Sequence, residues 1–163
     1  MQKDNSERYG TITRLIHWLT VALFIGLIAT VTAWKIDEHN YQLVPLHALL
    51  GTSVLLFAIV RLIRSIWLNR YRPMNTLFAK SGHILLILLS IIVPVIGIIR
   101  QMGMDDNHQV KIQWAVDLGN QWHGELAILL ILLIFGHIFM ALWHYFKGKS
   151  VFGRMWGNQG VKK

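Results

Sequence analysis

The chain has 163 residues, a length that suits one domain. With 54% hydrophobic and only 15% charged residues, its composition is too apolar for a soluble domain of this size, and a membrane protein is predicted. The absence of cysteine excludes disulfides, thiolate-bound iron–sulfur clusters and covalent cofactor attachment through a C-x-x-C-H motif, so any metal must be bound by histidine, methionine or carboxylates.

Four apolar segments follow one another along the chain, separated by polar connections. Helices are expected at about 11–34, 43–67, 82–99 and 122–146. Each segment is long enough to cross about 30 Å of hydrocarbon, at a rise of about 1.5 Å per residue. The residues before the first segment carry charges of both signs and no cleavage pattern, which indicates a permanent span and not a signal peptide. The sequence therefore predicts an all-α fold, a membrane-embedded four-helix bundle, as a single domain over residues 1–163.

The basic residues fall mainly on one side of the predicted membrane. With the N-terminus inside, thirteen of the sixteen Lys and Arg lie on the inner side, and only Lys35, Arg100 and Lys111 lie outside. Six of the eight acidic residues lie outside. This asymmetry predicts that both termini are cytoplasmic. The net charge of +8 thus reflects topology and contact with anionic lipids, and it does not indicate nucleic-acid binding.

Histidines interrupt the first and the fourth apolar segments. His17 lies in RLIHWLTVALFIG, where an imidazole among aliphatic side chains is costly unless its nitrogens find a partner. The fourth segment, WHGELAILLILLIFGHIFMALWHYF, contains His123 and His137, which are 14 residues apart. Because this interval is close to four helical turns, both are expected to point the same way, at depths about 21 Å apart.

Depth in a bundle of alternating helices predicts which histidines face each other. His47, near the outer start of the second helix, shares a level with His123. His17 lies toward the inner end of the first helix, where its expected partner is His137 or His144, with His83 as a competitor.

Two facing pairs at two depths are the ligand set that two bis-histidine haems b require, with neutral imidazoles on both axial positions. Gly51 and Gly136, near His47 and His137, would let a flat porphyrin approach the backbone. The alternative is that each imidazole merely forms a hydrogen bond to a neighbouring helix, which is less compatible with several histidines on different helices.

Two arginines follow His47 on the second helix. Arg61 is 14 residues later, hence on the same face and about 21 Å deeper. A haem propionate is its expected counter-charge, and inner lipid phosphates are the alternative. For Arg64, contact with lipid phosphates is the expected role.

The remaining histidines lie near the membrane surfaces. His83 and His144 are expected at the inner surface, where they either form hydrogen bonds to quinone carbonyls and pass protons, or hold the helix ends. His39 and His108 lie in the outer loops and are either plain solvated residues or part of a site.

The sequence resembles the prokaryotic cytochrome b561 family, the four-helix di-haem membrane cytochromes b. The matching stretches cover most of residues 8 to 146: RYGTITRLIHWL, PLHALLGTSVLLFAIVRLIR, GHILLILLSIIVPVIGII and WHGELAILLILLIFGHIFMALWHYF. The resemblance implies that the first, second and fourth helices supply the iron ligands, here His17, His47, His123 and His137. It thereby favours His137 as the inner partner of His17. It also implies electron transfer between quinone and a second redox partner, and the best-defined activity in the family is superoxide:quinone oxidoreduction.

Three functions are compatible with these features. The first is a di-haem oxidoreductase between quinone and an outer donor, with superoxide as the favoured donor. The second is a cytochrome b electron-transfer subunit that docks a dehydrogenase or a periplasmic redox protein. The third is a membrane scaffold or metal transporter without redox chemistry. No fingerprint for nicotinamide or ATP binding occurs, so neither is a direct partner of this chain.

Overall fold

The fold consists of four helices, as predicted. The structure, a computed structural model, describes residues 3–4, 9–36, 42–67, 77–105, 107, 109–148, 153 and 155. The helices are α1 (Thr11–Ile36), α2 (Leu43–Trp67), α3 (Leu77–Met102) and α4 (Gln113–Phe146). All four are long and apolar enough to cross a membrane. Within the described residues no strand forms, and a single antiparallel bridge joins Met104 to Val110 after α3. The all-α four-helix membrane fold is therefore confirmed.

Two helices begin earlier than the hydropathy predicted. The bounds of α2 coincide with the expected 43–67, but α3 begins at Leu77 instead of 82 and α4 at Gln113 instead of 122. The added part of α4 has an amphipathic pattern, with Ala115, Val116 and Gly119 buried. This spacing places the three residues on one helical face, which packs against the end of α3. Hydropathy marks the hydrocarbon-spanning part of a helix and misses an extension of this kind.

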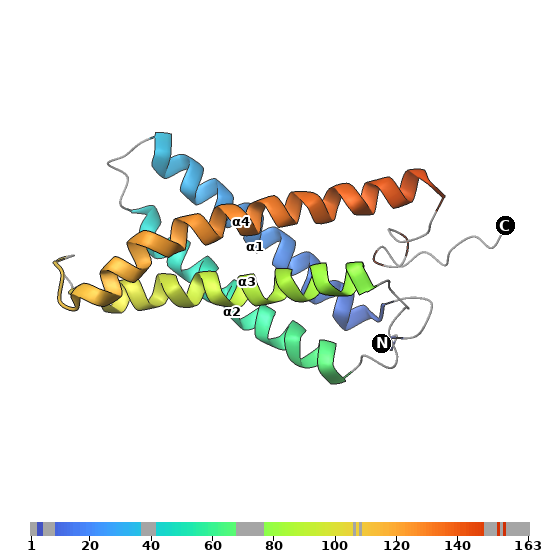
Figure 1. Ribbon diagram of the computed structural model, residues 1–163, viewed down its shortest axis with the longest axis horizontal. Helices are drawn as coiled ribbons and strands as arrows, with labels where there is room; N and C mark the ends of the chain where they lie inside the picture. The colour runs from blue at the N-terminus through green and yellow to red at the C-terminus, as the bar shows by residue number, and fades with distance from the viewer. Residues whose placement is uncertain are drawn as a thin grey trace.

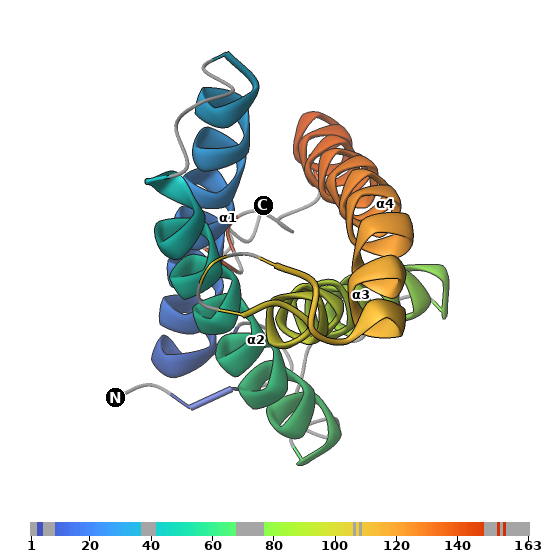
Figure 2. The same ribbon diagram turned by 90° about the vertical axis from the view of Figure 1, so that its left-hand side faces the viewer.

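Helices that are adjacent in the sequence pack against each other. α1 contacts α2, α2 contacts α3, and α3 contacts α4. α1 and α2 cross α3 and α4 obliquely, and the backbones of α1 and α4 stay apart, as the view along the bundle shows (Figure 2). The helices alternate in direction, so α1 begins and α4 ends at the same end of the bundle (Figure 1). Which end is cytoplasmic stays a prediction from the charge distribution.

A thin apolar layer forms the centre of the bundle. Leu89 and Val93 of α3 and Leu130 of α4 form this layer and are 4–7% exposed, and Phe24 of α1 packs against them. Most other large apolar side chains face outward, as expected for helices surrounded by lipid. Leu130 lies halfway between His123 and His137 in the sequence, so the layer separates two levels of the bundle.

Glycine allows α3 and α4 to approach closely at the end of the bundle where α3 ends. A Cβ atom on Gly119 would lie 2.2 Å from Cβ of Arg100, and one on Gly103 would lie 2.9 Å from Cγ2 of Val116. Arg100 then lies across α4, where its Nε donates a hydrogen bond to Oδ1 of Asn120 at 2.7 Å. Small residues at such crossings allow close van der Waals packing, which holds helices together in lipid, where the hydrophobic effect does not act between them.

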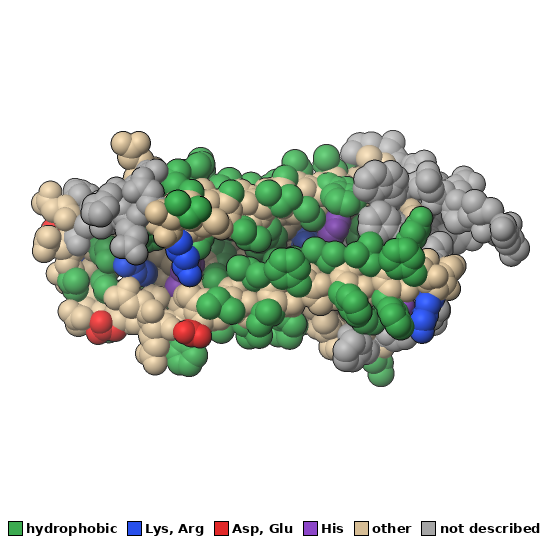
Figure 3. All heavy atoms as spheres, turned by 90° about the horizontal axis from the view of Figure 1, so that it is seen from above, with side chains coloured by type: hydrophobic (Ala, Val, Ile, Leu, Met, Phe, Trp, Pro, Cys, Tyr) green, Lys and Arg blue, Asp and Glu red, His purple; other side chains and the backbone are tan. Residues whose placement is uncertain are grey.

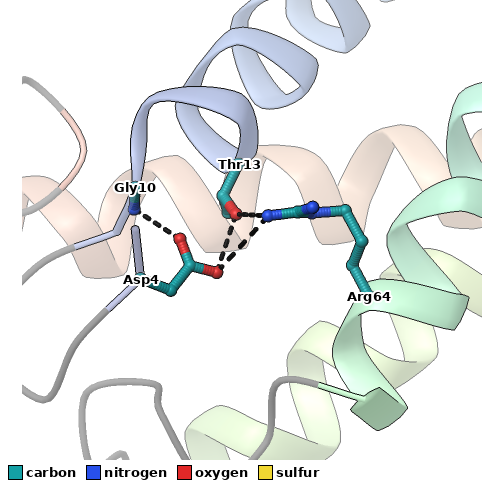
Figure 4. Close-up of polar contacts among 4 residues, drawn as sticks. All are labelled: Asp4, Gly10, Thr13 and Arg64. Atoms are coloured by element: carbon teal, nitrogen blue, oxygen red, sulfur yellow. Dashed lines mark hydrogen bonds and ion pairs between the residues drawn. The ribbon is translucent and has the colours of Figure 1, made fainter. Parts of the chain in front are cut away.

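Arg64 joins α2 to the start of α1 (Figure 4). Its Nη2 donates a hydrogen bond to Oγ1 of Thr13 at 2.9 Å and lies 3.7 Å from Oδ2 of Asp4. The Asp4 carboxylate, which is 1% exposed, also accepts hydrogen bonds from the backbone N–H of Gly10 and the hydroxyl of Thr13. The expectation that Arg64 extends to lipid phosphates is therefore wrong, because its guanidinium is directed to a buried carboxylate.

Candidate functional site

His47 and His123 face each other at one level of the bundle. Their ring centres are 6.3 Å apart, with an angle of 77° between the ring planes. His47 lies one turn after the start of α2, and His123 lies on α4 after the amphipathic extension. Both side chains are half-buried. The structure thus brings together the two histidines that depth placed at the outer level.

Thr30 of α1 fixes the orientation of the His47 ring. The Thr30 hydroxyl lies 2.8 Å from the backbone oxygen of Leu27 and 2.9 Å from Nδ1 of His47. A carbonyl oxygen only accepts, so the single hydroxyl proton points to Leu27 and the hydroxyl oxygen accepts a hydrogen bond from Nδ1. His47 therefore carries its proton on Nδ1, which leaves the lone pair of Nε2 available to a metal.

The His123 ring is oriented by the backbone of α3. Its Nδ1 lies 3.0 Å from the backbone oxygen of Val93, so Nδ1 must be the protonated donor and Nε2 again has the free lone pair. Gly97 makes room for this ring. A Cβ atom at position 97 would lie 2.8 Å from Cε1 and 3.0 Å from Nδ1 of His123.

A second set of histidines lies at the other level, which the charge distribution predicts to be the inner one. His17 of α1 and His137 of α4 have ring centres 6.5 Å apart, at an interplanar angle of 66°. His83 of α3 also contacts His137, with ring centres 5.1 Å apart. Arg61 of α2 lies within electrostatic reach of both His17 and His137. All four helices therefore contribute a polar side chain to this level.

Iron–imidazole geometry distinguishes between these contacts. A metal-bound imidazole nitrogen lies about 2 Å from the metal and roughly 1 Å from its ring centre, so two imidazoles on opposite sides of one iron have ring centres about 6 Å apart. The His47–His123 and His17–His137 separations of 6.3 and 6.5 Å fit this value. The 5.1 Å between His83 and His137 is too short. His83 thus lies beside the His17–His137 pair, and its ring is too close to His137 for the two to bind one metal from opposite sides.

The surroundings of the pairs fit a flat macrocycle. Figure 3 shows a hollow between α1 and α4, with histidine and Lys/Arg side chains visible inside it. A Cβ atom on Gly136, next to His137, would have no neighbour within 4 Å, and one on Gly51 would meet only Cβ of Pro94 at 4.0 Å. Among the described residues, no three His, Asp or Glu side chains converge on a metal-ion site. The donor set is one of facing histidine pairs, which is that of haem.

The other predicted histidines lie in different surroundings. His144 is half-buried near the end of α4, and its Nδ1 is buried without a hydrogen-bond partner in the described part of the chain. His83 lies deeper than expected, beside His137. His39 and His108 are outside the described residues.

Sequence reasoning missed Thr30, Gly97 and the Val93 carbonyl. A signal for Thr30 was present, because its hydroxyl interrupts an apolar segment six residues before α1 ends, at about the depth of His47. No signal for Gly97 was present, since a glycine in an apolar helix does not reveal which side chain it faces.

Comparison with known proteins shows a family and a relative that the chain resembles. The sequence model of the family described as "Prokaryotic cytochrome b561" matches residues 8–158. The chain is also 26% identical to "Cytochrome b561 homolog 2" of Escherichia coli (strain K12), over 90% of this chain and 89% of that protein. No solved structure matches the chain significantly.

Proposed function

Because the chain belongs to the prokaryotic cytochrome b561 family of membrane electron-transfer proteins, we propose that it binds two haems b and passes electrons from an outer donor to quinone. The family implies binding of haem b. The observation that supports two haems is the presence of two facing histidine pairs, with ring centres 6.3 and 6.5 Å apart, on either side of an apolar layer.

Each level has its own binding residues in this proposal. At the outer level, Nε2 of His47 and of His123 would hold the haem iron, while Thr30 and the Val93 carbonyl orient the two rings through Nδ1. At the inner level, His17 and His137 would hold the iron, and the Arg61 guanidinium would neutralise a propionate. When bound, each haem supplies a one-electron redox centre.

The two levels separate the site of electron donation from the site of acceptance. His123 and His137 are 14 residues apart, which corresponds to about 20 Å along the helix. The buried apolar layer of Leu89, Val93 and Leu130 lies between these two depths. With the inner level facing the cytoplasm of a bacterial inner membrane, quinone takes its two protons from the cytoplasmic side.

Superoxide is the donor that we propose, in a superoxide:quinone oxidoreduction. Two superoxide anions each lose one electron and leave as O₂, and quinone gains two electrons and two protons to become quinol. Lys35 at the end of α1, Arg100 near the end of α3 and exposed Lys111 supply the positive charge expected to attract an anion.

The acidic residues at the same end favour a second candidate, docking of a redox protein or dehydrogenase with a basic surface. Asp105 and Asp117 are exposed there. Their charges would attract such a partner and repel superoxide.

Stopped-flow absorbance of the haem-loaded protein distinguishes the two donors. Superoxide is expected to reduce the haem rapidly, added quinone is expected to reoxidise it, and superoxide dismutase is expected to abolish the signal. Haem that dithionite reduces but superoxide does not would favour the docked redox partner. Purified protein without any reducible haem b would contradict both functions.

Quinone is proposed to bind near His83 and His144, whose imidazoles can form hydrogen bonds to its carbonyls and pass protons. We expect His144→Ala to keep both haems and their reduction by superoxide, while reoxidation by quinone becomes about tenfold or more slower. His83→Ala is expected to act in the same direction, although its contact with His137 makes an additional spectral change of the inner haem expected. Reoxidation of both variants at the wild-type rate would place the quinone site elsewhere, most simply at the outer level.

A further inference from the structure

The two histidine pairs differ in the hydrogen bonds that their Nδ1 atoms form. At the outer level, Nδ1 of His47 donates to Thr30, and Nδ1 of His123 donates to the Val93 carbonyl. At the inner level, Nδ1 of His17 is buried and has no hydrogen-bond partner among the described residues. Both outer histidines therefore have acceptors for their Nδ1 protons, and the described part of the chain offers none to His17.

This difference changes the electron density that each ligand gives to a metal. A hydrogen bond from Nδ1–H draws the proton away from the ring and makes the imidazole a stronger donor through Nε2. A stronger donor stabilises the ferric state more than the ferrous state, which lowers the reduction potential. The positive charge of Arg61, near His17 and His137, acts in the opposite sense at the inner level, because it stabilises the state with the additional electron.

We infer that Thr30 is a positioning residue that fixes the ring of His47 and lowers the reduction potential of the outer haem. This inference rests on the proposed function, in which His47 and His123 bind a haem. Its consequence is directional. A lower potential at the outer level would favour transfer of an electron from there to the inner level, where one centre would lose the electron that the other gains.

The Thr30 hydroxyl is suited to this role by its surroundings. Thr30 is 6% exposed, so water does not compete for the His47 proton. Its own proton is engaged by the Leu27 carbonyl at 2.8 Å, which leaves the oxygen as a pure acceptor toward His47. The hydrogen bonds from His47 to Thr30 and from Thr30 to the Leu27 carbonyl are consecutive, so each one strengthens the other.

The test replaces the hydroxyl by a methyl group of the same shape. Thr30→Val is introduced into the His17→Ala background, in which only the outer haem is expected to remain, so that the measured potential belongs to one centre. We expect the midpoint potential to shift upward and the haem affinity to fall by roughly 10- to 100-fold. Thr30→Ser, which retains the hydroxyl, is expected to restore both values.

Thr32→Val is the matched control. Thr32 lies on the same helix, and its hydroxyl donates to the Ile28 carbonyl at 2.8 Å in the same manner. Thr32→Val should leave the midpoint potential of the outer haem unchanged. Loss of the haem in Thr30→Val together with its retention in Thr32→Val would support the positioning role. In that case the midpoint potential is measured in the protein with threonine at position 30 and in the Thr30→Ser variant, and the two values must agree.

Two results would overturn the inference. One is an unshifted potential in a Thr30→Val protein that retains its haem. The other is an equal shift in Thr30→Val and Thr30→Ser, which would exclude the hydroxyl as the cause. Neither result would contradict the proposed function, which instead fails if the protein with all its histidines binds no reducible haem.

Discussion

His123→Ala is expected to leave one haem b per chain, where two are expected in the unmodified protein. The facing rings of His47 and His123 are the proposed axial ligands of the outer haem, so His47→Ala should have the same effect. His17→Ala and His137→Ala should instead remove the inner haem and retain the outer one. The measurement is the pyridine haemochrome content per chain, together with a reduced-minus-oxidised spectrum of each purified variant.

The two losses should be independent because a packed apolar layer lies between the levels. Leu89, Val93 and Leu130 are 4–7% exposed, and Phe24 packs against them, so removing one pair leaves this packing in place. His144→Ala is the control, since it changes a histidine of α4 outside both pairs. A folded, membrane-inserted His123→Ala protein that lost both haems would show that the sites depend on each other. A haem content near one in the unmodified, fully loaded protein would eliminate one pair.

Gly97→Ala is expected to disrupt the outer haem site without changing either ligand. The added Cβ atom would lie 2.8 Å from Cε1 and 3.0 Å from Nδ1 of His123, closer than carbon contacts allow. The ring must turn away, and its hydrogen bond to the Val93 carbonyl is lost. We expect the affinity for the outer haem to fall by roughly 10- to 100-fold, as for other losses of a partner that orients a metal ligand. The inner haem should be retained, as checked by haem titration of the purified protein.

Gly124→Ala is the matched control for this substitution. Gly124 adjoins His123 in the sequence, yet a Cβ atom there would have no neighbour within 4 Å. Alanine in place of glycine should also favour the helix by about 1 kcal/mol. If Gly97→Ala binds both haems with wild-type affinity and spectrum, the His123 ring does not lie against Gly97 in the loaded protein.

The sequence by itself determined the number of spans, their order and the shared level of His47 and His123. Hydropathy marks a stretch that crosses the hydrocarbon, and the rise per residue of a helix converts position into depth. This was sufficient to place His47 beside His123, which the structure also does, at 6.3 Å between ring centres. It also located α2 at residues 43–67. The first turns of α3 and α4 were missed, because they lie outside the apolar segments that hydropathy detects.

Only the tertiary structure decided which side chains meet at a given level. The expected partners of His17 were His137 and His144, with His83 as a competitor, and a resemblance was needed to favour one of them. In the fold, the rings of His17 and His137 are 6.5 Å apart and His83 lies beside them. Depth could not resolve this, because it fixes position along the membrane normal but not the rotation of a helix or its lateral neighbours.

The same reason explains the contacts that no pattern indicated. The helices are apolar on all sides, since their outer faces meet lipid, so periodicity does not mark an inward face. Thr30 next to His47, Gly97 beneath the His123 ring and Arg64 on Asp4 depend on how the helices pack around small residues. Packing of this kind is settled by the shapes of several helices at once, and it is therefore a property of the fold and not of any one segment.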